Sequence, residues 1–233
     1  MDTTLPTSAI TAPANGAKLN ALSSITGTGS DAAGGVQKVE ITISDGVNYW
    51  TGSAWGVLTW LLTTGTTSWS YTSPTWTSGT TYAIQSRATD NATNLQSPVT
   101  SASFTFDTSS PTFGGLGGAT SVSPTQIDLS WTVATDTVSA GANIVYQVCQ
   151  STSSLACQGS FTATYTTTAG VTSYNVTSLT SGTRYYFVVR AKDEANNVDG
   201  NTVEKSAVTW GPNTAVAITN HLGDHTCALA SDG

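Results

Sequence analysis

Charged residues and histidine are scarce in this chain of 233 residues. Charged side chains make up 9% of the sequence, against about 25% in typical soluble globular proteins. Residues 1–214 contain no histidine, which excludes Ser–His or Cys–His nucleophile pairs and the usual zinc ligands there. Glutamate occurs only at Glu40, Glu194 and Glu204, so a glycosidase pair of carboxylates would need aspartate. The composition therefore predicts that the protein is not an enzyme.

Basic patches and long apolar runs are missing as well. The net charge of −7 argues against partners such as nucleic acid or an anionic membrane surface. No apolar run approaches the roughly 18 residues needed to span a bilayer, so we expect no membrane insertion. Met1 is not followed by a signal peptide. The Thr-rich, Lys-poor, acidic composition is common in exported β-proteins. We therefore expect a fragment of a secreted or cell-surface protein, with the export signal absent from the fragment.

Short segments in which apolar and polar residues alternate predict strands throughout the first 210 residues. Turn-forming clusters of Gly, Asn, Asp, Ser and Pro separate these segments, as in β-sandwiches. No helical periodicity persists beyond two turns. The fold class is therefore predicted to be all-β. The clearest predicted strands are residues 39–43, 82–88, 103–106, 127–131, 144–148 and 186–191.

An internal repeat divides the chain. Ser78–Asn94 aligns without a gap on Ser181–Asn197, at an offset of 103 residues and with nine of seventeen positions identical. The motif Asp-Thr-x-x-Pro-Thr also occurs twice, starting at Asp2 and at Asp107. A period this long indicates whole domains in series rather than a solenoid. We predict two domains, over residues 1–110 and 111–210, followed by a separate segment over residues 211–233.

The second unit resembles a fibronectin type III domain. The resemblance is carried by IDLSW at Ile127–Trp131, IVYQV at Ile144–Val148 and the Leu-x-x-Gly-Thr-x-Tyr run at Leu179–Tyr185. It implies that Tyr185 is a tyrosine-corner residue, whose hydroxyl bonds back to the backbone at the corner between two strands.

The first unit resembles a bacterial Ig-like repeat of large secreted or surface proteins. SITGTGSD, VQKVEITI, YWTGSAW and SRATDNATN carry this resemblance, together with the flanking Asp-Thr-x-x-Pro-Thr motifs. Thr93 departs from the pattern, because glycine is more usual before the last Asn. The resemblances together imply two Ig-like/fibronectin type III β-sandwiches in series.

Five of the seven tryptophans lie between residues 50 and 76. The repeat places Trp69 and Trp76 on core positions of the second unit. Trp50, Trp55 and Trp60 have no counterpart there, and NYWTGSAW predicts a hairpin with Trp50 and Trp55 on facing strands. This hairpin is either an aromatic pair that closes an edge of the sandwich or a stacking surface for a glycan.

Two cysteines lie close together in the second unit. Cys149 ends a predicted strand and Cys157 follows in the next loop, so we expect a local disulfide in an exported domain. A metal pair is the alternative, but no further soft ligand lies nearby. The third cysteine belongs to GDHTCALASDG (Gly223–Gly233), which resembles the start of a blade in propellers named after the regulator of chromosome condensation. That resemblance implies a short C-terminal stub of a β-propeller blade.

Aspartates recur at equivalent places in the two units. In an Ig-like sandwich, the start of the chain and the loops after the second and sixth strands meet at one pole. Each unit has an aspartate in all three places, and such carboxylates suit Ca²⁺. They also suit Asx turns that bind no ion. The candidate calcium ligands are Asp2, Asp31 and Asp90 in the first unit and Asp107, Asp136 and Asp193 in the second.

These features predict a non-catalytic extracellular spacer in a bacterial adhesin or surface fibre, which holds a binding domain away from the cell. Its expected partners are neighbouring domains of the same long chain, and surface glycans or protein receptors. One alternative is a glycan-binding module that uses the hairpin of Trp50, Trp55 and Trp60. Another is a self-assembling filament subunit, in which the C-terminal segment adds a strand to a neighbouring sheet.

Overall fold

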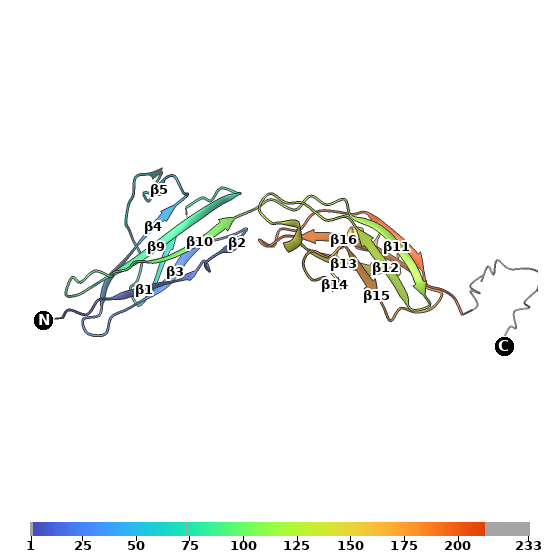
Figure 1. The fold of residues 1–233 in the computed structure, drawn as a ribbon, viewed down its shortest axis with the longest axis horizontal. Helices are drawn as coiled ribbons and strands as arrows, with labels where there is room; N and C mark the ends of the chain where they lie inside the picture. The colour runs from blue at the N-terminus through green and yellow to red at the C-terminus, as the bar shows by residue number, and fades with distance from the viewer. Residues whose placement is uncertain (1, 73, 213–233) are drawn as a thin grey trace, which may run out of the picture.

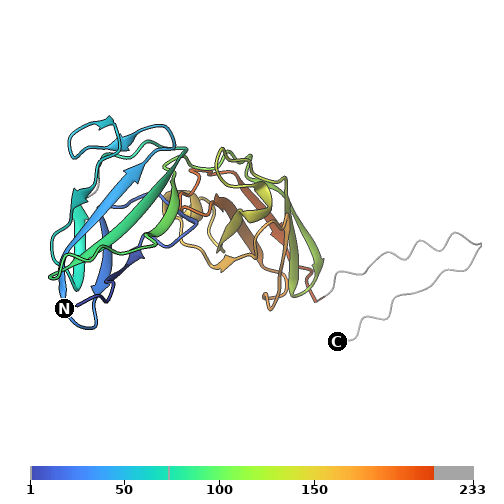
Figure 2. The same ribbon diagram turned by 60° about the vertical axis from the view of Figure 1, so that its left-hand side comes forward.

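The computed structural model describes residues 2–72 and 74–212, and these form two β-sandwiches in series. Figure 1 shows them one after the other along the longest axis, and Figure 2 shows the same succession from a second direction. Each of the four sheets takes its strands from one sandwich only, because β1–β10 end at Phe106 and β11–β17 begin at Leu116. The architecture confirms the predicted fold class.

The first sandwich consists of a three-stranded sheet facing a larger one. The smaller sheet has the order β1-β3-β8, with β1 at Thr7–Ala12, β3 at Ser24–Ser30 and β8 at Ser68–Thr72. The larger sheet has the order β2-β10-β9-β4-β5-β6, and β7 pairs with β4 beside this path. Its strands are β2 (Ala17–Leu19), β10 (Thr100–Phe106), β9 (Thr80–Asp90), β4 (Val36–Ser44), β5 (Tyr49–Trp50), β6 (Trp55–Gly56) and β7 (Leu61–Leu62).

The second sandwich pairs a three-stranded sheet with a four-stranded one. The orders are β11-β12-β15 and β14-β13-β16-β17. Two short helices interrupt the strands: η1 at Gly141–Asn143 and α1 at Ala156–Gly159. The strands are β11 (Leu116–Ser123), β12 (Gln126–Trp131), β13 (Val145–Ser151), β14 (Tyr165–Thr166), β15 (Ser173–Val176), β16 (Arg184–Lys192) and β17 (Glu204–Val208).

Alternation of apolar and polar residues builds a separate core in each sandwich. On β4 the side chains of Val39, Ile41 and Ile43 are fully buried, because every second residue of a strand faces the opposite sheet. Full burial of each such side chain is worth roughly 1.5–3 kcal/mol. Trp69 is buried in the first core, as predicted, whereas Trp76 is half-buried at its margin.

A tyrosine corner is present in both sandwiches. The Tyr185 hydroxyl accepts a hydrogen bond from the Thr180 amide at 3.0 Å, which confirms the role predicted for this residue. Tyr82, its counterpart at the repeat offset, accepts from the Thr77 amide at 2.9 Å. Each bond fixes the corner through which the chain enters the longest strand of its sandwich, β16 or β9.

The predicted propeller stub lies outside the described residues, apart from Gly211 and Pro212. Within the described part of the chain, no helix has the length and apolar character required to traverse a lipid bilayer.

Candidate carboxylate sites, interdomain contacts and aromatic hairpin

Three aspartates converge at one pole of the first sandwich. Asp2 precedes β1, Asp31 follows β3 and Asp90 is the last residue of β9. Each offers a carboxylate oxygen, and these oxygens all lie within 4.8 Å of one another. We call this set the first cage.

The second sandwich repeats the arrangement at the pole that faces the first. Asp107 directly follows β10 in the linker, Asp136 lies after β12, and Asp193 directly follows β16. Their carboxylate oxygens also lie within 4.8 Å of one another. We call this set the linker cage. The structure thus brings together all six aspartates as two groups of three, while their binding of calcium stays a prediction.

Asx turns orient the carboxylates in both cages. One oxygen of Asp2 accepts from the Thr4 amide at 2.9 Å, and one oxygen of Asp107 accepts from the Ser109 amide at 3.0 Å. Asp136 Oδ1 accepts from two amides, Val138 and Ser139, both at 2.8 Å. The Asx turns expected for these aspartates therefore form, but each uses only one carboxylate oxygen.

An asparagine closes each cage from the loop after the longest strand of the sandwich, β9 or β16. The Asn197 side-chain amide donates to Asp193 Oδ2 at 2.8 Å and to the Asp107 carbonyl at 2.9 Å. Asn94 makes the same pair of bonds in the first cage, to Asp90 Oδ2 and the Asp2 carbonyl. Asn197 was not predicted as part of this site, although it aligns with Asn94 at the repeat offset.

Among the described residues, three carboxylate oxygens are buried without a hydrogen-bond partner: Asp2 Oδ2, Asp31 Oδ1 and Asp107 Oδ2. Asp107 is fully buried, whereas Asp2 and Asp31 are half-buried. Burial raises the pKa of Asp193, hydrogen bonds from Asn197 oppose the rise, and the nearby charges of Asp107 and Asp136 add to it. The linker cage therefore combines a fully buried carboxylate that has an unpartnered oxygen with two further carboxylates close by.

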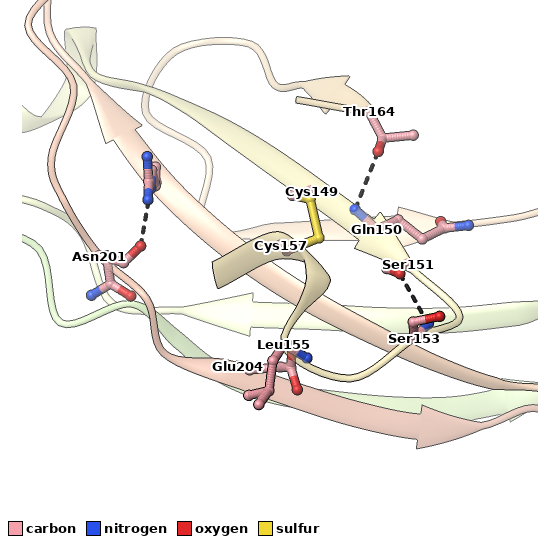
Figure 3. The surroundings of a disulfide bond; sticks show 10 residues. Cys149, Gln150, Ser151, Ser153, Leu155, Cys157, Thr164, Asn201 and Glu204 are labelled. Carbon is pink, nitrogen blue, oxygen red and sulfur yellow. Dashed lines mark hydrogen bonds between the residues drawn. A yellow bond between two sulfur atoms is a disulfide. The ribbon is translucent and has the colours of Figure 1, made fainter. Parts of the chain in front are cut away.

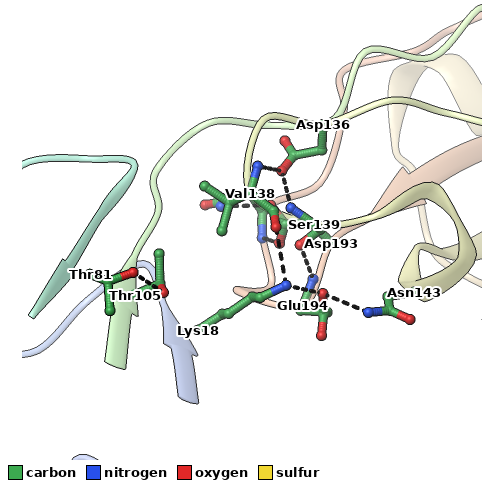
Figure 4. A network of polar contacts seen from close by, with 10 residues as sticks. Lys18, Thr81, Thr105, Asp136, Val138, Ser139, Asn143, Asp193 and Glu194 are labelled. Atoms are coloured by element: carbon green, nitrogen blue, oxygen red, sulfur yellow. Dashed lines mark hydrogen bonds and ion pairs between the residues drawn. The ribbon is translucent and has the colours of Figure 1, made fainter. Parts of the chain in front are cut away.

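Polar contacts beside the linker cage join the two sandwiches (Figure 4). Lys18, on β2 of the first sandwich, donates to the Val138 carbonyl of the second sandwich at 3.1 Å and forms an ion pair with Glu194. The Asn20 side-chain amide donates to Asn197 Oδ1 at 3.2 Å. These residues are more than 100 positions apart in the chain, and no local pattern in the sequence marks them as partners.

The aromatic hairpin has the predicted pairing. Trp50 on β5 lies opposite Trp55 on β6, with ring centroids 5.7 Å apart, and the Thr51 amide closes the turn by donating to the Ala54 carbonyl at 2.8 Å. Trp55 also stacks on the core residue Tyr82 at 5.6 Å. Both tryptophans are half-buried and pack against the first core, so the hairpin extends that core at the edge of the sheet.

The third tryptophan of this group has a different neighbour. The Arg87 guanidinium lies 3.9 Å from the centre of the Trp60 ring and also pairs with Glu40. A hollow of about 340 Å³ lies beside the hairpin. It is lined by Trp50, Gly52, Leu62, Thr64, Ser70, Tyr71 and Thr72. Glycan contact by Trp50, Trp55 and Trp60 stays a prediction.

The expected disulfide is present (Figure 3). Cys149 on β13 is bonded to Cys157, which lies in the single-turn helix α1 rather than in an open loop. The turn before α1 is held by Glu204 of β17, which accepts from the Leu155 amide at 2.9 Å. The bridge thus fastens α1 to β13 of the four-stranded sheet.

Comparison with known protein families assigns both sandwiches. Residues 6–85 match the family described as "Bacterial Ig domain", and residues 109–209 match the family described as "Fibronectin type III domain". The chain is 34% identical over 155 residues to exoglucanase B of Cellulomonas fimi, which covers 64% of this chain and 13% of that protein. It is 32% identical over 146 residues to chitinase A1 of Niallia circulans, which covers 58% of this chain and 19% of that protein. The chain therefore spans a small part of the length of these relatives.

Solved structures show the same architecture. The FN1–FN3 domains of chicken CNTN1 superpose with a TM-score of 0.53 at 16% identity, over 88% of this chain and 65% of that one. The fibronectin(III)-like modules of Clostridium thermocellum CbhA superpose with a TM-score of 0.50 at 15% identity, over 94% of this chain and 100% of that one. At these identities the likeness establishes the fold alone. From the two family matches and the two sandwiches, we conclude that this chain contains a bacterial Ig-like domain followed by a fibronectin type III domain.

Proposed function

We propose that the chain is a non-catalytic extracellular spacer within a longer secreted or surface protein of the adhesin or fibre type. The observation that carries this proposal is the end-to-end succession of two sandwiches with direct polar contacts at their junction. A spacer of this kind separates its neighbouring domains by the length of two sandwiches and limits their relative motion.

The family matches and the scarcity of catalytic groups support this role. Fibronectin type III and Ig-like domains serve in many proteins as non-catalytic modules, and fold alone does not supply a catalytic site. The match to parts of an exoglucanase and a chitinase supports an accessory position beside another domain in the same chain. The Thr- and Ser-rich surface, the disulfide and these relatives support an extracellular location.

A surface-display experiment tests the spacer function. Residues 2–212 are placed between a membrane anchor and an antibody-fragment binding domain, and capture of antigen-coated beads by the cells is measured. We expect capture to match that given by an unrelated tandem pair of sandwiches and to exceed that given by a Gly/Ser linker with the same number of residues. Capture no better than with the flexible linker would contradict the spacer function.

The aromatic hairpin favours one second candidate, a glycan-binding module. The hollow beside Trp50 and Tyr71 combines aromatic and hydroxyl groups, a combination that suits the faces and hydroxyls of a sugar. If this function is correct, the protein binds members of a glycan array, and Trp50→Ala loses this binding while the fold, measured by circular dichroism, is retained. A complete lack of binding by the unsubstituted protein contradicts it.

Filament formation by strand addition involves residues outside the described structure. It predicts concentration-dependent sedimentation that is lost on removal of residues 214–233.

A further inference from the structure

One buried carboxylate oxygen in the linker cage has no partner among the described residues. Asp107 is fully buried, and its Oδ1 atom accepts from the Ser109 amide at 3.0 Å and, more weakly, from the Ser78 hydroxyl at 3.4 Å. Its Oδ2 atom accepts nothing. A buried ionised group without a partner is costly, because it loses its hydration and gains no compensating interaction. A cation bound to Asp107 Oδ2 would supply the missing interaction.

Protein side chains do not supply this cation within the described part of the chain. The nearest lysine in the polar network at this pole is Lys18, and its ammonium group is bound to the Val138 carbonyl and to Glu194 (Figure 4). All of the salt bridges that involve described residues lie elsewhere than on Asp107, Asp136 and Asp193. The three carboxylates thus face one another without a positively charged partner.

The geometry of the linker cage suits a calcium ion. Calcium binds oxygen at about 2.3–2.6 Å, so two oxygens that share one ion lie no more than about 5 Å apart. The three carboxylate oxygens lie within 4.8 Å of one another, which meets this limit. Magnesium binds oxygen at about 2.0–2.1 Å and demands near-octahedral geometry, so the more permissive calcium fits these oxygens better.

Hydrogen bonds already hold the carboxylates in place. The amides of Val138 and Ser139 fix Asp136, and Asn197 fixes Asp193 through both its backbone and its side chain. A hollow of about 320 Å³ lies beside Asp136, and serine and threonine side chains line most of it. The loops therefore need little rearrangement to bind a cation.

We propose that Asp107, Asp136 and Asp193 bind one calcium ion, and that this ion fixes the contact between the two domains. The route between the ion and the first domain is short. Ser139 donates its amide to Asp136 at 2.8 Å, and its hydroxyl accepts from the Glu194 amide at 3.2 Å. Glu194 in turn holds Lys18 of the first domain. Ordering of the two loops by calcium therefore orders the groups that Lys18 contacts.

The proposal is confined to the linker cage. In the first cage Asp2 and Asp31 each have one buried oxygen without a partner among the described residues, but both residues are half-buried, whereas Asp107 is fully buried. Calcium at the first cage stays a sequence-based prediction. The calcium site at the linker cage does not depend on the spacer function, since ion binding is measured on the isolated chain.

Isothermal titration with CaCl₂ tests the site directly. The protein is stripped with EDTA and titrated as four forms: unsubstituted, Asp31→Asn, Asp136→Asn and Asp45→Asn. Asparagine retains the acceptor oxygen of an Asx turn and removes the charge. Asp45 is the matched control, because it caps a turn through the amides of Val47 and Asn48 and belongs to neither cage.

We expect saturable calcium binding by the unsubstituted protein. Asp136→Asn should bind one calcium ion fewer, or bind calcium with an affinity at least about tenfold lower, because the substitution removes a ligand charge. Asp31→Asn retains at least one ion, and Asp45→Asn matches the unsubstituted protein. Magnesium at the same concentration gives weaker binding. A lack of saturable binding at millimolar calcium overturns the proposal. So does identical binding by Asp136→Asn and the unsubstituted protein, provided that circular dichroism shows both to be folded.

Discussion

At the scale of single residues, the loop that closes each cage contains a residue with a left-handed backbone. Thr93 has φ of 70° and Asn196, its counterpart at the repeat offset, has φ of 73°. Asparagine tolerates this conformation, whereas a β-branched residue such as threonine is strained in it. The glycine that is more usual before the last Asn of this motif would remove that strain. The sequence deviation at Thr93 therefore has a structural cost.

Replacement of Thr93 by glycine is expected to stabilise the first domain. Thr93→Gly relieves a strain of about 1–2 kcal/mol, and the greater entropy of glycine in the unfolded chain offsets part of this gain. We expect a net increase of about 1 kcal/mol in the free energy of unfolding, measured by urea denaturation. Asn196→Gly is the matched control and should change stability by less. Equal effects of the two substitutions would show that Thr93 is not strained.

Asp193 makes the stability of the calcium-free protein depend on pH. Burial raises its pKa, and the charges of Asp107 and Asp136 act in the same direction. A carboxyl group with a raised pKa in the folded state binds more protons there than in the unfolded chain. Between the ordinary pKa of about 3.9 and the raised value, the free energy of unfolding therefore falls as the pH increases.

The contribution of Asp193 is measured by comparison with Asp193→Asn in EDTA. Asp199 has a pKa that burial likewise raises, and it contributes with the same sign in both proteins. We expect the unsubstituted protein to lose more stability than Asp193→Asn as the pH rises from about 4, because only the former ionises a buried carboxyl at this position. Parallel stability curves for the two proteins would contradict this assignment.

At the scale of elements, the disulfide fixes helix α1 to the sheet. The bridge closes a short loop between Cys149 and Cys157, eight positions apart. In the chain-entropy model a loop of this size stabilises the fold by roughly 2–3 kcal/mol. The turn before α1 has one more anchor, Glu204 on β17.

Loss of the disulfide is expected to lower the stability of the second domain. Cys149→Ser/Cys157→Ser should reduce the free energy of unfolding by roughly 2–3 kcal/mol. Measurements in a Cys227→Ser background exclude exchange with the third cysteine, and dithiothreitol should have no further effect on the double variant. If reduction of the parent protein leaves its urea midpoint unchanged, the bridge does not stabilise the fold.

Long strands with an alternating pattern were easier to predict than the short strands at the edge of the first sandwich. The alternating pattern predicted the central parts of β4 and β9, residues 39–43 and 82–88, because one face of each strand is buried. The β5–β6 hairpin was predicted from its turn sequence, but the pairing of β7 with β4 was not, because no local period marks a strand of two residues. Trp76 was expected in the core but lies half-buried at its margin, where its indole donates to the Leu22 carbonyl at 2.9 Å.

At the scale of the whole molecule, the junction between the domains combines predictable and unpredictable parts. The aspartates of the linker cage could be predicted because the repeat and the sandwich topology bring them to one pole. Lys18, Asn20 and Glu194 could not, since their contacts depend on the relative orientation of two domains. The interdomain angle is thus set by residues whose partners are distant in the sequence.

The central claim is that calcium in the linker cage holds the two domains in one orientation. Small-angle X-ray scattering of residues 1–233 in calcium and in EDTA tests it most directly, with Asp136→Asn as the variant and Asp45→Asn as its control. We predict that the calcium form fits a single arrangement of the two sandwiches, and that EDTA or Asp136→Asn broadens the ensemble and changes the maximum dimension. Identical scattering profiles of the unsubstituted protein in calcium and in EDTA would contradict the claim.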